Sequence, residues 1–196
     1  SMELTNSAWK NATSKIFLGV LLFSLSGIAG GILAALLGLV LKSLTLVSIV
    51  VLIAGIAAIL GYVLYVLGLG NFKNILSGED AAAVSKIWLA ALLALAGSVI
   101  TVVTSFIPGI AIIGTIAAIA AYVLNLLGFM ALKNSSTFPT MAKAGANKLF
   151  LAYILYLAGS IAAFFLPSFI AGIINLVALV MIILGWAAIK NANVEA

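Results

Sequence analysis

The sequence lacks the side chains on which most enzymes and metal sites depend. Its 196 residues include no Cys and no His, and all nine basic residues are Lys, so Arg is absent as well. Disulfides are therefore excluded, and so are metal sites built on thiolate or imidazole ligands. Without Arg or a dense basic cluster, nucleic-acid binding is not expected either. We predict no metal site and no cofactor.

Charge of either sign is scarce, whereas apolar residues are abundant. Charged residues make up 7% of the chain and hydrophobic residues 66%, and the mean hydropathy is +1.40. A soluble domain carries about 25% charged residues. Because no soluble fold of this size can bury so much apolar surface, the surrounding solvent must be lipid. The composition predicts an integral membrane protein.

Six apolar runs separate the charged residues. They are Ile16–Leu41, Leu44–Gly70, Ile87–Phe106, Gly109–Leu132, Leu149–Leu166 and Ser168–Ile189. Each meets or approaches the roughly 20 residues that a helix needs to cross the hydrocarbon core. Backbone groups in lipid must bond within the chain, and the runs lack the alternating polarity of transmembrane strands. The predicted fold class is an all-α integral membrane protein with six transmembrane helices.

The lysines predict the orientation. Eight of the nine would share one side of the membrane: Lys10, Lys15, Lys73, Lys86, Lys133, Lys143, Lys148 and Lys190. Only Lys42 lies on the other side. An excess of lysine in short loops marks the cytoplasmic face, so we expect cytoplasmic termini and a multi-pass protein of the inner (plasma) membrane of a prokaryote. Trp88 and Trp186 each lie close to one of these lysines and are expected in the interfacial aromatic belt.

One sequence pattern occurs three times. An apolar run ends with Gly, then Lys five residues later and Asn directly after it, at 67–74, 127–134 and 184–191. Each copy opens with Lys, a bulky aliphatic residue and an aromatic residue, beginning at Lys15, Lys86 and Lys148. Parallel repeats of this kind can be related by an axis along the membrane normal. We therefore predict that the six helices are three tandem copies of a helical hairpin.

The hairpins divide the chain into four segments. These are a cytoplasmic N-terminal segment at 1–15, hairpin repeat 1 at 16–74, repeat 2 with its preceding cytoplasmic connection at 75–134, and repeat 3 with its connection and C-terminal tail at 135–196. From opening Lys to closing Gly the copies span 53, 42 and 37 residues. The first hairpin should tilt or project beyond the outer surface, with Lys42 at its tip. We expect Asp80 to cap a short interfacial helix, with a cation site at Glu79 and Asp80 as the alternative.

Uncharged polar residues are the candidates for a functional path. No Asp, Glu, His, Cys, Arg or Lys lies within a predicted span, apart from the tip residue Lys42. Acid–base catalysis and proton relays depend on such groups, so an enzyme is not expected. The path candidates are Ser98, Thr101, Thr104, Ser105, Asn125 and Asn175. The alternative is that the asparagines bond between helices and the hydroxyls bond back to their own helix.

Two further groups of residues are predicted to lie inside the bundle. The tyrosines lie deeper than an interfacial belt, so their hydroxyls need partners, and they would either pack or contact a flat or hydrophobic ligand: Tyr62, Tyr65, Tyr122, Tyr153 and Tyr156. The helix-packing candidates are small residues: Gly27, Gly31 and Gly38 in the first helix, and Ala58, Gly61 and Gly68 in the second. Small faces let backbones approach closely. We expect them to join the two helices of the first hairpin, with a homo-oligomer contact as the alternative.

In number of spans, chain length and inward termini, the chain resembles the substrate-binding membrane subunits of energy-coupling-factor vitamin transporters. With the polar path candidates lining a route, we expect a facilitator or transport subunit for a small neutral or apolar solute, without proton coupling of its own. The alternative is a non-transporting scaffold that binds a partner membrane protein or membrane lipids. A polar file continuous across the membrane would favour transport. A dry, tightly packed interior with exposed glycine faces would favour the scaffold.

Overall fold

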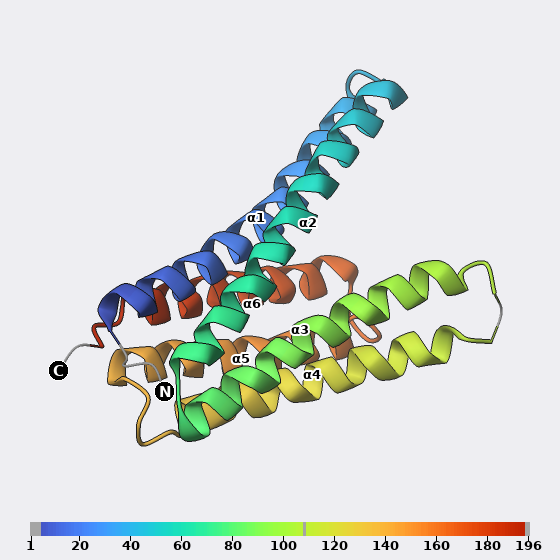
Figure 1. The fold of residues 1–196 in the computed structure, drawn as a ribbon. Coiled ribbons are helices and arrows are strands. Elements are labelled where there is room, and N and C mark those ends of the chain that lie inside the picture. The colour runs from blue at the N-terminus through green and yellow to red at the C-terminus, as the bar shows by residue number, and fades with distance from the viewer. Residues whose placement is uncertain (1–4, 108, 195–196) are drawn as a thin grey trace.

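The computed structural model describes residues 5–107 and 109–194, and this part of the chain is helical throughout its regular structure. The helices are α1 (Asn6–Leu39), α2 (Leu44–Ile75), α3 (Gly78–Thr104), α4 (Ala111–Lys133), α5 (Thr140–Ala162) and α6 (Ser168–Asn191) (Figure 1). All six are long and apolar enough to cross a membrane. The predicted set of six apolar helices is confirmed.

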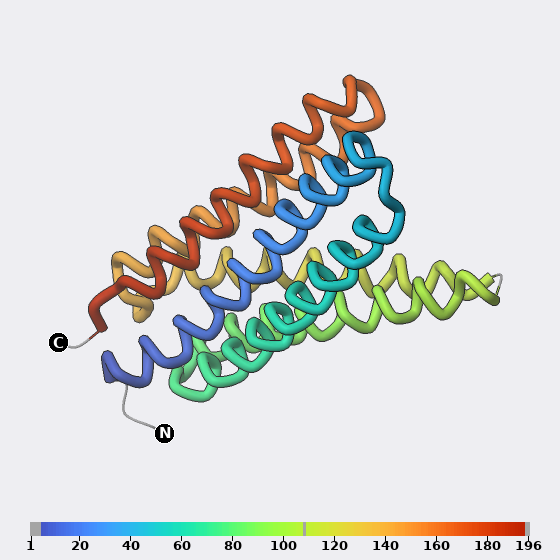
Figure 2. The backbone as a smooth tube through the Cα atoms, turned by 90° about the horizontal axis from the view of Figure 1, so that it is seen from above, coloured from blue at the N-terminus to red at the C-terminus, as the bar shows by residue number. Residues whose placement is uncertain are grey.

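The helices form three antiparallel hairpins that meet side to side. α1 packs on α2, α3 on α4, and α5 on α6. Three contacts between neighbouring hairpins, which we call seams, join α2 to α3, α4 to α5, and α6 back to α1. The helices therefore close into a ring, whose arrangement can be followed in Figures 1 and 2.

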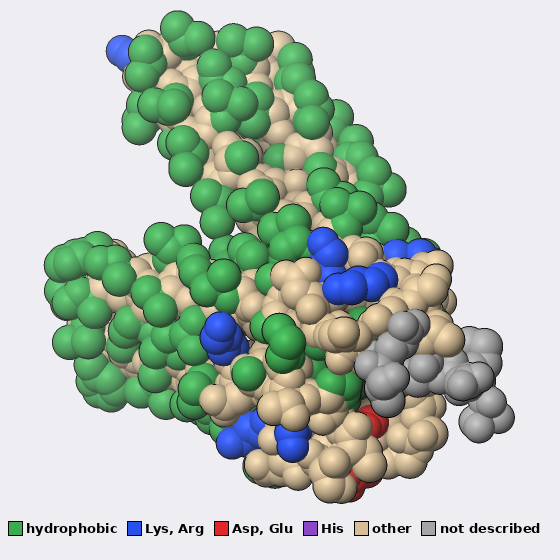
Figure 3. All heavy atoms as spheres, turned by 90° about the vertical axis from the view of Figure 1, so that its left-hand side faces the viewer, with side chains coloured by type: hydrophobic (Ala, Val, Ile, Leu, Met, Phe, Trp, Pro, Cys, Tyr) green, Lys and Arg blue, Asp and Glu red, His purple; other side chains and the backbone are tan. Residues whose placement is uncertain are grey.

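The two ends of the ring differ in charge. Since the helices alternate in direction, one end holds the start of α1, the end of α6 and the α2–α3 and α4–α5 connections, together with all lysines except Lys42. We call this the lysine end. Figure 3 looks onto this end and shows lysine and acidic side chains gathered there, while hydrophobic side chains cover the hairpins that extend away. Lys42 lies in the α1–α2 turn, at the opposite or tip end.

Helix α1 begins earlier than the sequence analysis expected. Its first residue is Asn6, and Thr5 caps it by accepting a hydrogen bond from the Ala8 amide at 3.1 Å. Most of the expected N-terminal segment is therefore the first part of α1. This part also closes the α6–α1 seam, because the Trp9 indole Nε1 donates to the carbonyl oxygen of Ile189 at 2.7 Å.

The expected short interfacial helix near Asp80 is wrong. Helix α3 runs without interruption from Gly78 to Thr104, and Ser77, not Asp80, occupies the N-cap position. The physical reason is that three alanines, a strong helix-forming run, follow Asp80 and no Gly or Pro interrupts the chain before the apolar segment.

Asp80 instead ties two connections together. Its side chain is 6% exposed. Its carboxylate accepts hydrogen bonds from the Ser135 hydroxyl at 2.5 Å and the Thr137 hydroxyl at 2.7 Å. Glu79 beside it is exposed and also accepts a bond from Ser135, at 3.1 Å. These acidic side chains therefore hold the start of α3 to the α4–α5 connection, and the described residues contain no cluster of three or more candidate metal ligands.

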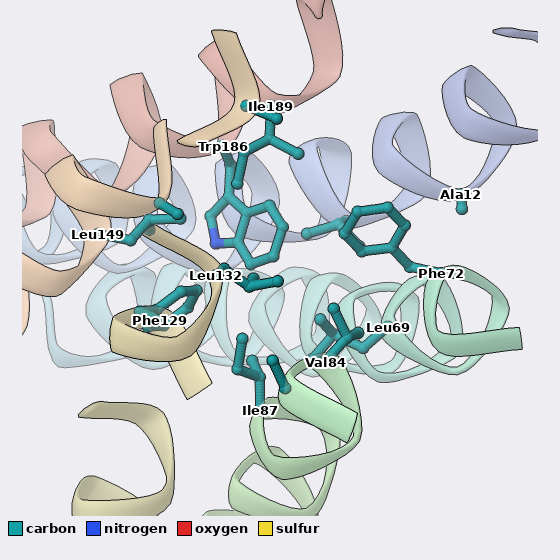
Figure 4. Packing of buried hydrophobic residues seen from close by; sticks show 14 of the residues in the cluster. Ala12, Leu69, Phe72, Val84, Ile87, Phe129, Leu132, Leu149, Trp186 and Ile189 are labelled. Carbon is teal, nitrogen blue, oxygen red and sulfur yellow. The ribbon is translucent and has the colours of Figure 1, made fainter. Parts of the chain in front are cut away.

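Large apolar side chains fill the lysine end. The following are at most 1% exposed and come from all six helices; we call them the plug: Trp9, Ile16, Leu69, Phe72, Val84, Ile87, Phe129, Leu132, Leu149, Trp186 and Ile189. Figure 4 shows Trp186 in the middle of this packing, with Phe129 and Leu132 beside it. Trp186 therefore lies in the plug and not in the expected interfacial belt.

The hairpins separate towards the tip end. Figures 1 and 2 show that they diverge from the lysine end. Helix α1 has 34 residues and α4 has 23, so at about 1.5 Å per residue α1 is longer by roughly 16 Å. The large apolar side chains of the tips, such as Phe106 and Phe164, are exposed.

Contacts at the lysine end recur at corresponding positions of the three hairpins. The lysine that closes each hairpin lies over an aromatic ring of the next: Lys73 over Trp88 at 4.2 Å, Lys133 over Phe150 at 4.8 Å and Lys190 over Phe17 at 4.9 Å. The closing glycines also correspond, since a Cβ would lie within 2.6–2.8 Å of side-chain atoms of Ile16 at Gly68, of Ile87 at Gly128 and of Leu149 at Gly185. Each hairpin thus crosses closely at this end.

The packing face of α1 differs from the expected one. Gly61 and Gly68 of α2 do lie against the α1 backbone, where a Cβ would be 2.6 Å from the Phe23 amide and 2.7 Å from the Ile16 amide. A Cβ on Gly38 would make an ordinary contact of 3.5 Å with Val47, and Ala58 is half-buried. At Gly27 and Gly31, however, no described atom lies within 4 Å of the position a Cβ would take.

The residues that bring α1 close to α2 are others. A Cβ on Gly19 would lie 2.5 Å from the Gly61 carbonyl oxygen, and one on Gly30 would lie 2.5 Å from the Ala54 Cβ. These positions are eleven residues apart, which is about three helical turns and keeps them on one face. The expected packing role of Gly27 and Gly31 within the hairpin is therefore corrected.

Candidate functional site

A cavity of about 820 Å³ lies between the hairpins, directly on the tip side of the plug. Residues of all six helices line it. Along α3 the lining runs from Ala90 to Thr101, which is about 16 Å of helix. Trp186 belongs both to the plug and to the cavity wall, so the plug forms the floor of the cavity.

Small residues create this space. Gly19 of α1, Ala94 and Gly97 of α3, and Gly114 and Ala118 of α4 all line the cavity. The α3–α4 crossing is close here, since a Cβ on Gly97 would lie 3.2 Å from the Gly114 carbonyl oxygen. Each hairpin can therefore pack tightly within itself while leaving room between hairpins. The sequence analysis did not single out these positions.

Tyrosines connect two of the three seams beside the cavity. The Tyr62 hydroxyl of α2 donates to the Ala91 carbonyl oxygen of α3. The Tyr122 hydroxyl of α4 donates to the Tyr153 carbonyl oxygen of α5 at 2.6 Å. Counted back six residues from the closing glycine, the corresponding residue of α6 is Leu179. A leucine has no hydroxyl, so this residue cannot supply such a bond at the α6–α1 seam.

Four of the six predicted path residues line the cavity: Ser98, Thr101, Asn125 and Asn175. The other two lie nearer the tip of α3, where Thr104 is buried and Ser105 is exposed. All four hydroxyls bond back to α3: Ser98 to Ala94 at 2.9 Å, Thr101 to Gly97 at 2.8 Å, Thr104 to Thr101 at 3.3 Å and Ser105 to Val102 at 2.6 Å. Their protons are therefore used within their own helix.

The two asparagines differ from the hydroxyls. The side-chain oxygens of Asn125 and Asn175 are buried and have no hydrogen-bond partner among the described residues. Asn175 lies against α5, where a Cβ on Gly159 would be 2.5 Å from its Oδ1. Buried acceptors without a donor are uncommon in folded proteins. The asparagines are thus the most unusual polar groups of the cavity.

The rest of the wall is apolar and aromatic. Among the described residues that line the cavity, none carries a charge. At the floor, Tyr65 meets Trp186 edge to face, with ring centroids 6.2 Å apart, and the Phe129 ring of the plug stacks on Tyr153 at 5.5 Å. Such a site offers apolar and aromatic contact with a few hydrogen bonds, and it disfavours a charged molecule, whose desolvation nothing would offset.

Comparison with known proteins adds no relative to this description. No protein-family model, no curated protein and no solved structure matches the chain.

Proposed function

We propose that this protein is a membrane protein that binds a small, neutral and mainly apolar molecule in the cavity between its hairpins, as a facilitator or transport subunit. One observation carries the proposal: a cavity of about 820 Å³ with an uncharged wall to which all six helices contribute. This volume is in the range of sites for small molecules, roughly 300–1,000 Å³.

The proposed setting is the inner membrane of a prokaryote, with the lysine end in the cytoplasm. The gathered lysines support this orientation, and the exposed apolar side chains of the hairpins support contact with lipid. The cavity then opens towards the outer half of the membrane. The recurring lysine–aromatic contacts support the further proposal that the hairpins are three tandem copies related by a threefold pseudo-axis along the membrane normal.

The plug separates the cavity from the cytoplasmic side and therefore limits how a solute could cross. The polar groups of the cavity do not continue through it, because its side chains are large, apolar and fully buried. A solute that enters from the outer side therefore crosses only if the plug rearranges. With no Asp, Glu, His, Cys, Lys or Arg in the cavity wall, the driving force for this step has to be the solute gradient or a partner protein, not a proton relay.

Binding of a lipid without transport is the second candidate function. The observation in its favour is the same plug, which separates the cavity from the cytoplasm. A lipid chain is also neutral and apolar, and the hairpins that surround the cavity diverge towards the tip end (Figures 1 and 2).

Fluorescence of Trp186 can test the proposed binding, because this residue lies at the cavity floor. In liposomes, a variant with Trp9→Phe and Trp88→Phe retains Trp186 as its single tryptophan. Bromobenzene, a neutral heavy-atom quencher, should quench it saturably. Ala94→Phe, which fills the cavity, should lower the saturable part severalfold, whereas Leu95→Phe on the exposed face of α3 should leave it unchanged.

Equal quenching in all three proteins would contradict a binding cavity. Vesicles with brominated acyl chains separate the two candidate functions. Strong quenching from these chains, lost in Ala94→Phe, identifies a lipid occupant, and weak quenching leaves the cavity to a solute.

Labelling tests the proposed orientation. Cysteines introduced at Ser43, in the α1–α2 turn, and at Ser136, in the α4–α5 connection, lie at opposite ends of the helices. An impermeant thiol reagent should reach Ser43→Cys from outside intact cells and Ser136→Cys only from the cytoplasm. Labelling of both from one side would rule out the span assignment.

A further inference from the structure

The cavity wall is not uniform, and its polar groups suggest which part of a ligand lies where. Tyr65, Asn125 and Ile182 occupy corresponding positions of α2, α4 and α6, each three residues before the closing glycine. All three line the cavity, as does Trp186 at the floor. Two polar groups and one apolar group therefore face the cavity at the level nearest the plug.

Most hydrogen-bond donors near this level already have acceptors within the protein. The hydroxyls of Tyr62 and Tyr122 donate to the carbonyl oxygens of Ala91 and Tyr153. Asn125 Oδ1 has no partner and is buried. Tyr65 likewise has no hydrogen-bond partner within the described part of the chain, and its hydroxyl can both donate and accept. The protein thus leaves the Asn125 acceptor unpaired, because no donor of its own helices reaches it.

Farther from the plug the wall changes. Towards the tips the cavity is bounded by Gly97, Gly114 and Ala118, and the hydroxyls of Ser98 and Thr101 are bonded within α3. About 16 Å of α3 separates Ala90 from Thr101 along this wall. The space suits an extended apolar body whose polar end lies at the floor.

We propose that Asn125 and Tyr65 form a subsite for the polar end of the ligand, which is a neutral amphiphile with a hydroxyl or N–H donor at one end of an apolar body. The inference rests on the proposed function, since it concerns the same cavity. The donor bonds to Asn125 Oδ1, and where the donor is a hydroxyl, the Tyr65 hydroxyl donates to its oxygen. Ile182 and Trp186 cover the apolar atoms next to it.

The proposed ligand also explains why a protein would be required. A purely apolar solute crosses lipid unaided, whereas a hydroxyl or amide loses its hydrogen bonds to water on entering hydrocarbon. A paired acceptor at the cavity floor removes that loss. The chemistry is shared by a free alcohol and by a lipid with a single hydroxyl, such as a diacylglycerol.

Displacement of bromobenzene from the single-tryptophan protein in liposomes tests the subsite. The probes are 1-nonanol, decane and 2-nonanone, which are similar in length and differ in the end group. We expect 1-nonanol to displace the quencher at about tenfold lower concentration than decane, because a site that pairs a hydroxyl discriminates against the analogue that lacks it. Asn125→Leu should remove that preference and leave the decane curve unchanged, and Asn125→Gln, which keeps an acceptor oxygen, should restore part of it.

Asn175→Leu is the matched control, since Asn175 Oδ1 is also unpaired but faces Gly159 of α5. It should leave the preference for 1-nonanol intact. Equal displacement by all three probes in the parent would overturn the subsite while the cavity stands. A preference for 2-nonanone, or an Asn125→Leu effect on decane as large as on 1-nonanol, would also overturn it. If no probe displaces the quencher, the proposed function itself fails.

One further experiment, in which dioleoylglycerol is added to the vesicles, shows whether the ligand is a lipid or a free solute. Displacement that depends on Asn125 in the same way as for 1-nonanol supports the subsite and identifies a lipid source. Displacement by 1-nonanol alone supports it with a solute source. If Asn125→Leu does not fold, Tyr65→Phe serves as the second variant. It should raise severalfold the concentration of 1-nonanol that displaces bromobenzene and leave that of decane unchanged.

Discussion

The two ends of this ring of helices are built from similar apolar residues and pack very differently. At the lysine end all six helices converge on side chains that are completely buried, whereas towards the tips the hairpins diverge and large apolar side chains are exposed. Hydrophobicity cannot account for the difference, because lipid is as apolar as leucine. What distinguishes the lysine end is close backbone approach, aromatic packing and polar ties between hairpins.

The polar ties act where water is near. Asp80 holds two connections through Ser135 and Thr137, and the closing lysines lie over rings of the neighbouring hairpin. Beyond the level of the tyrosines, no hydrogen bond between different hairpins is present in the described residues. Association of the hairpins is therefore specified at the lysine end, and the tip end is left free to hold a cavity.

The largest change in stability is expected when a glycine at the lysine end is replaced, compared with a glycine nearer the tip end. In Gly68→Leu the added side chain meets the Ile16 backbone, since a Cβ alone lies 2.7 Å from that amide nitrogen. We expect a loss of more than about 3 kcal/mol in the free energy of unfolding, because neither backbone can move without disturbing the plug. Gly27→Leu, on a face with nothing within 4 Å, should stay within about 0.5 kcal/mol.

Unfolding in mixed micelles with a rising fraction of sodium dodecyl sulfate measures both variants. Comparable losses in Gly68→Leu and Gly27→Leu would show that the two ends are equally packed and would remove the comparison. A large loss in Gly27→Leu alone would instead indicate that this exposed face contacts a second copy, as the sequence analysis considered.

Much of the fold could be predicted from the sequence because it depends on run length and composition. The number of helices, their hairpin pairing and the gathering of lysines at one end all follow from where the charges interrupt the apolar runs. The positions of the helix ends were harder to predict. Asp80 looks like a local cap, but its partners Ser135 and Thr137 are 55 and 57 residues away along the chain, and no local pattern contains them.

The packing faces and the cavity depend on angles that the sequence does not specify. Helix α1 has glycines on several faces, and the sequence does not say which of these faces turns towards α2. It therefore cannot distinguish the face of Gly19 and Gly30 from that of Gly27 and Gly31. By its sequence position, Trp186 resembles an interfacial tryptophan. The corresponding residues of the other hairpins, Leu69 and Phe129, are apolar and are equally buried. The aligned sequences therefore already indicated an apolar position here. Asn125 and Asn175 could be predicted because they are polar residues within apolar spans, whereas the size of the cavity follows from how far the hairpins diverge.

An intermediate effect is expected from the polar tie at Asp80. In Asp80→Ala the hydroxyls of Ser135 and Thr137 lose their acceptor, and hydrogen bonds to a charged group are worth about 1.5–3 kcal/mol. We expect a loss of about 2–3 kcal/mol in the same micelle assay. Glu79→Ala is the comparison, because Glu79 also accepts a bond from Ser135 but is exposed to water, and it should cost less than about 1 kcal/mol. Equal effects of the two substitutions would mean that surface charge, not the buried tie, stabilises this end.

The smallest effect, and the sharpest test of where the lysine end gives way to the cavity, concerns the tyrosines that join the seams. Removing one interhelical bond with Tyr122→Phe should cost about 0.6–1 kcal/mol. Leu179→Tyr should do the reverse if the hairpins correspond, because a hydroxyl at this position would reach the Val20 carbonyl as Tyr122 reaches that of Tyr153. Leu179 and Val20 both line the cavity, so this variant should gain stability of similar size. Stabilisation by Leu179→Tyr, with Leu179→Phe as the control that adds a ring but no hydroxyl, would support three equivalent seams. A loss in Leu179→Tyr as large as in Leu179→Phe would show that the α6–α1 seam has its own geometry and that the correspondence ends at the plug.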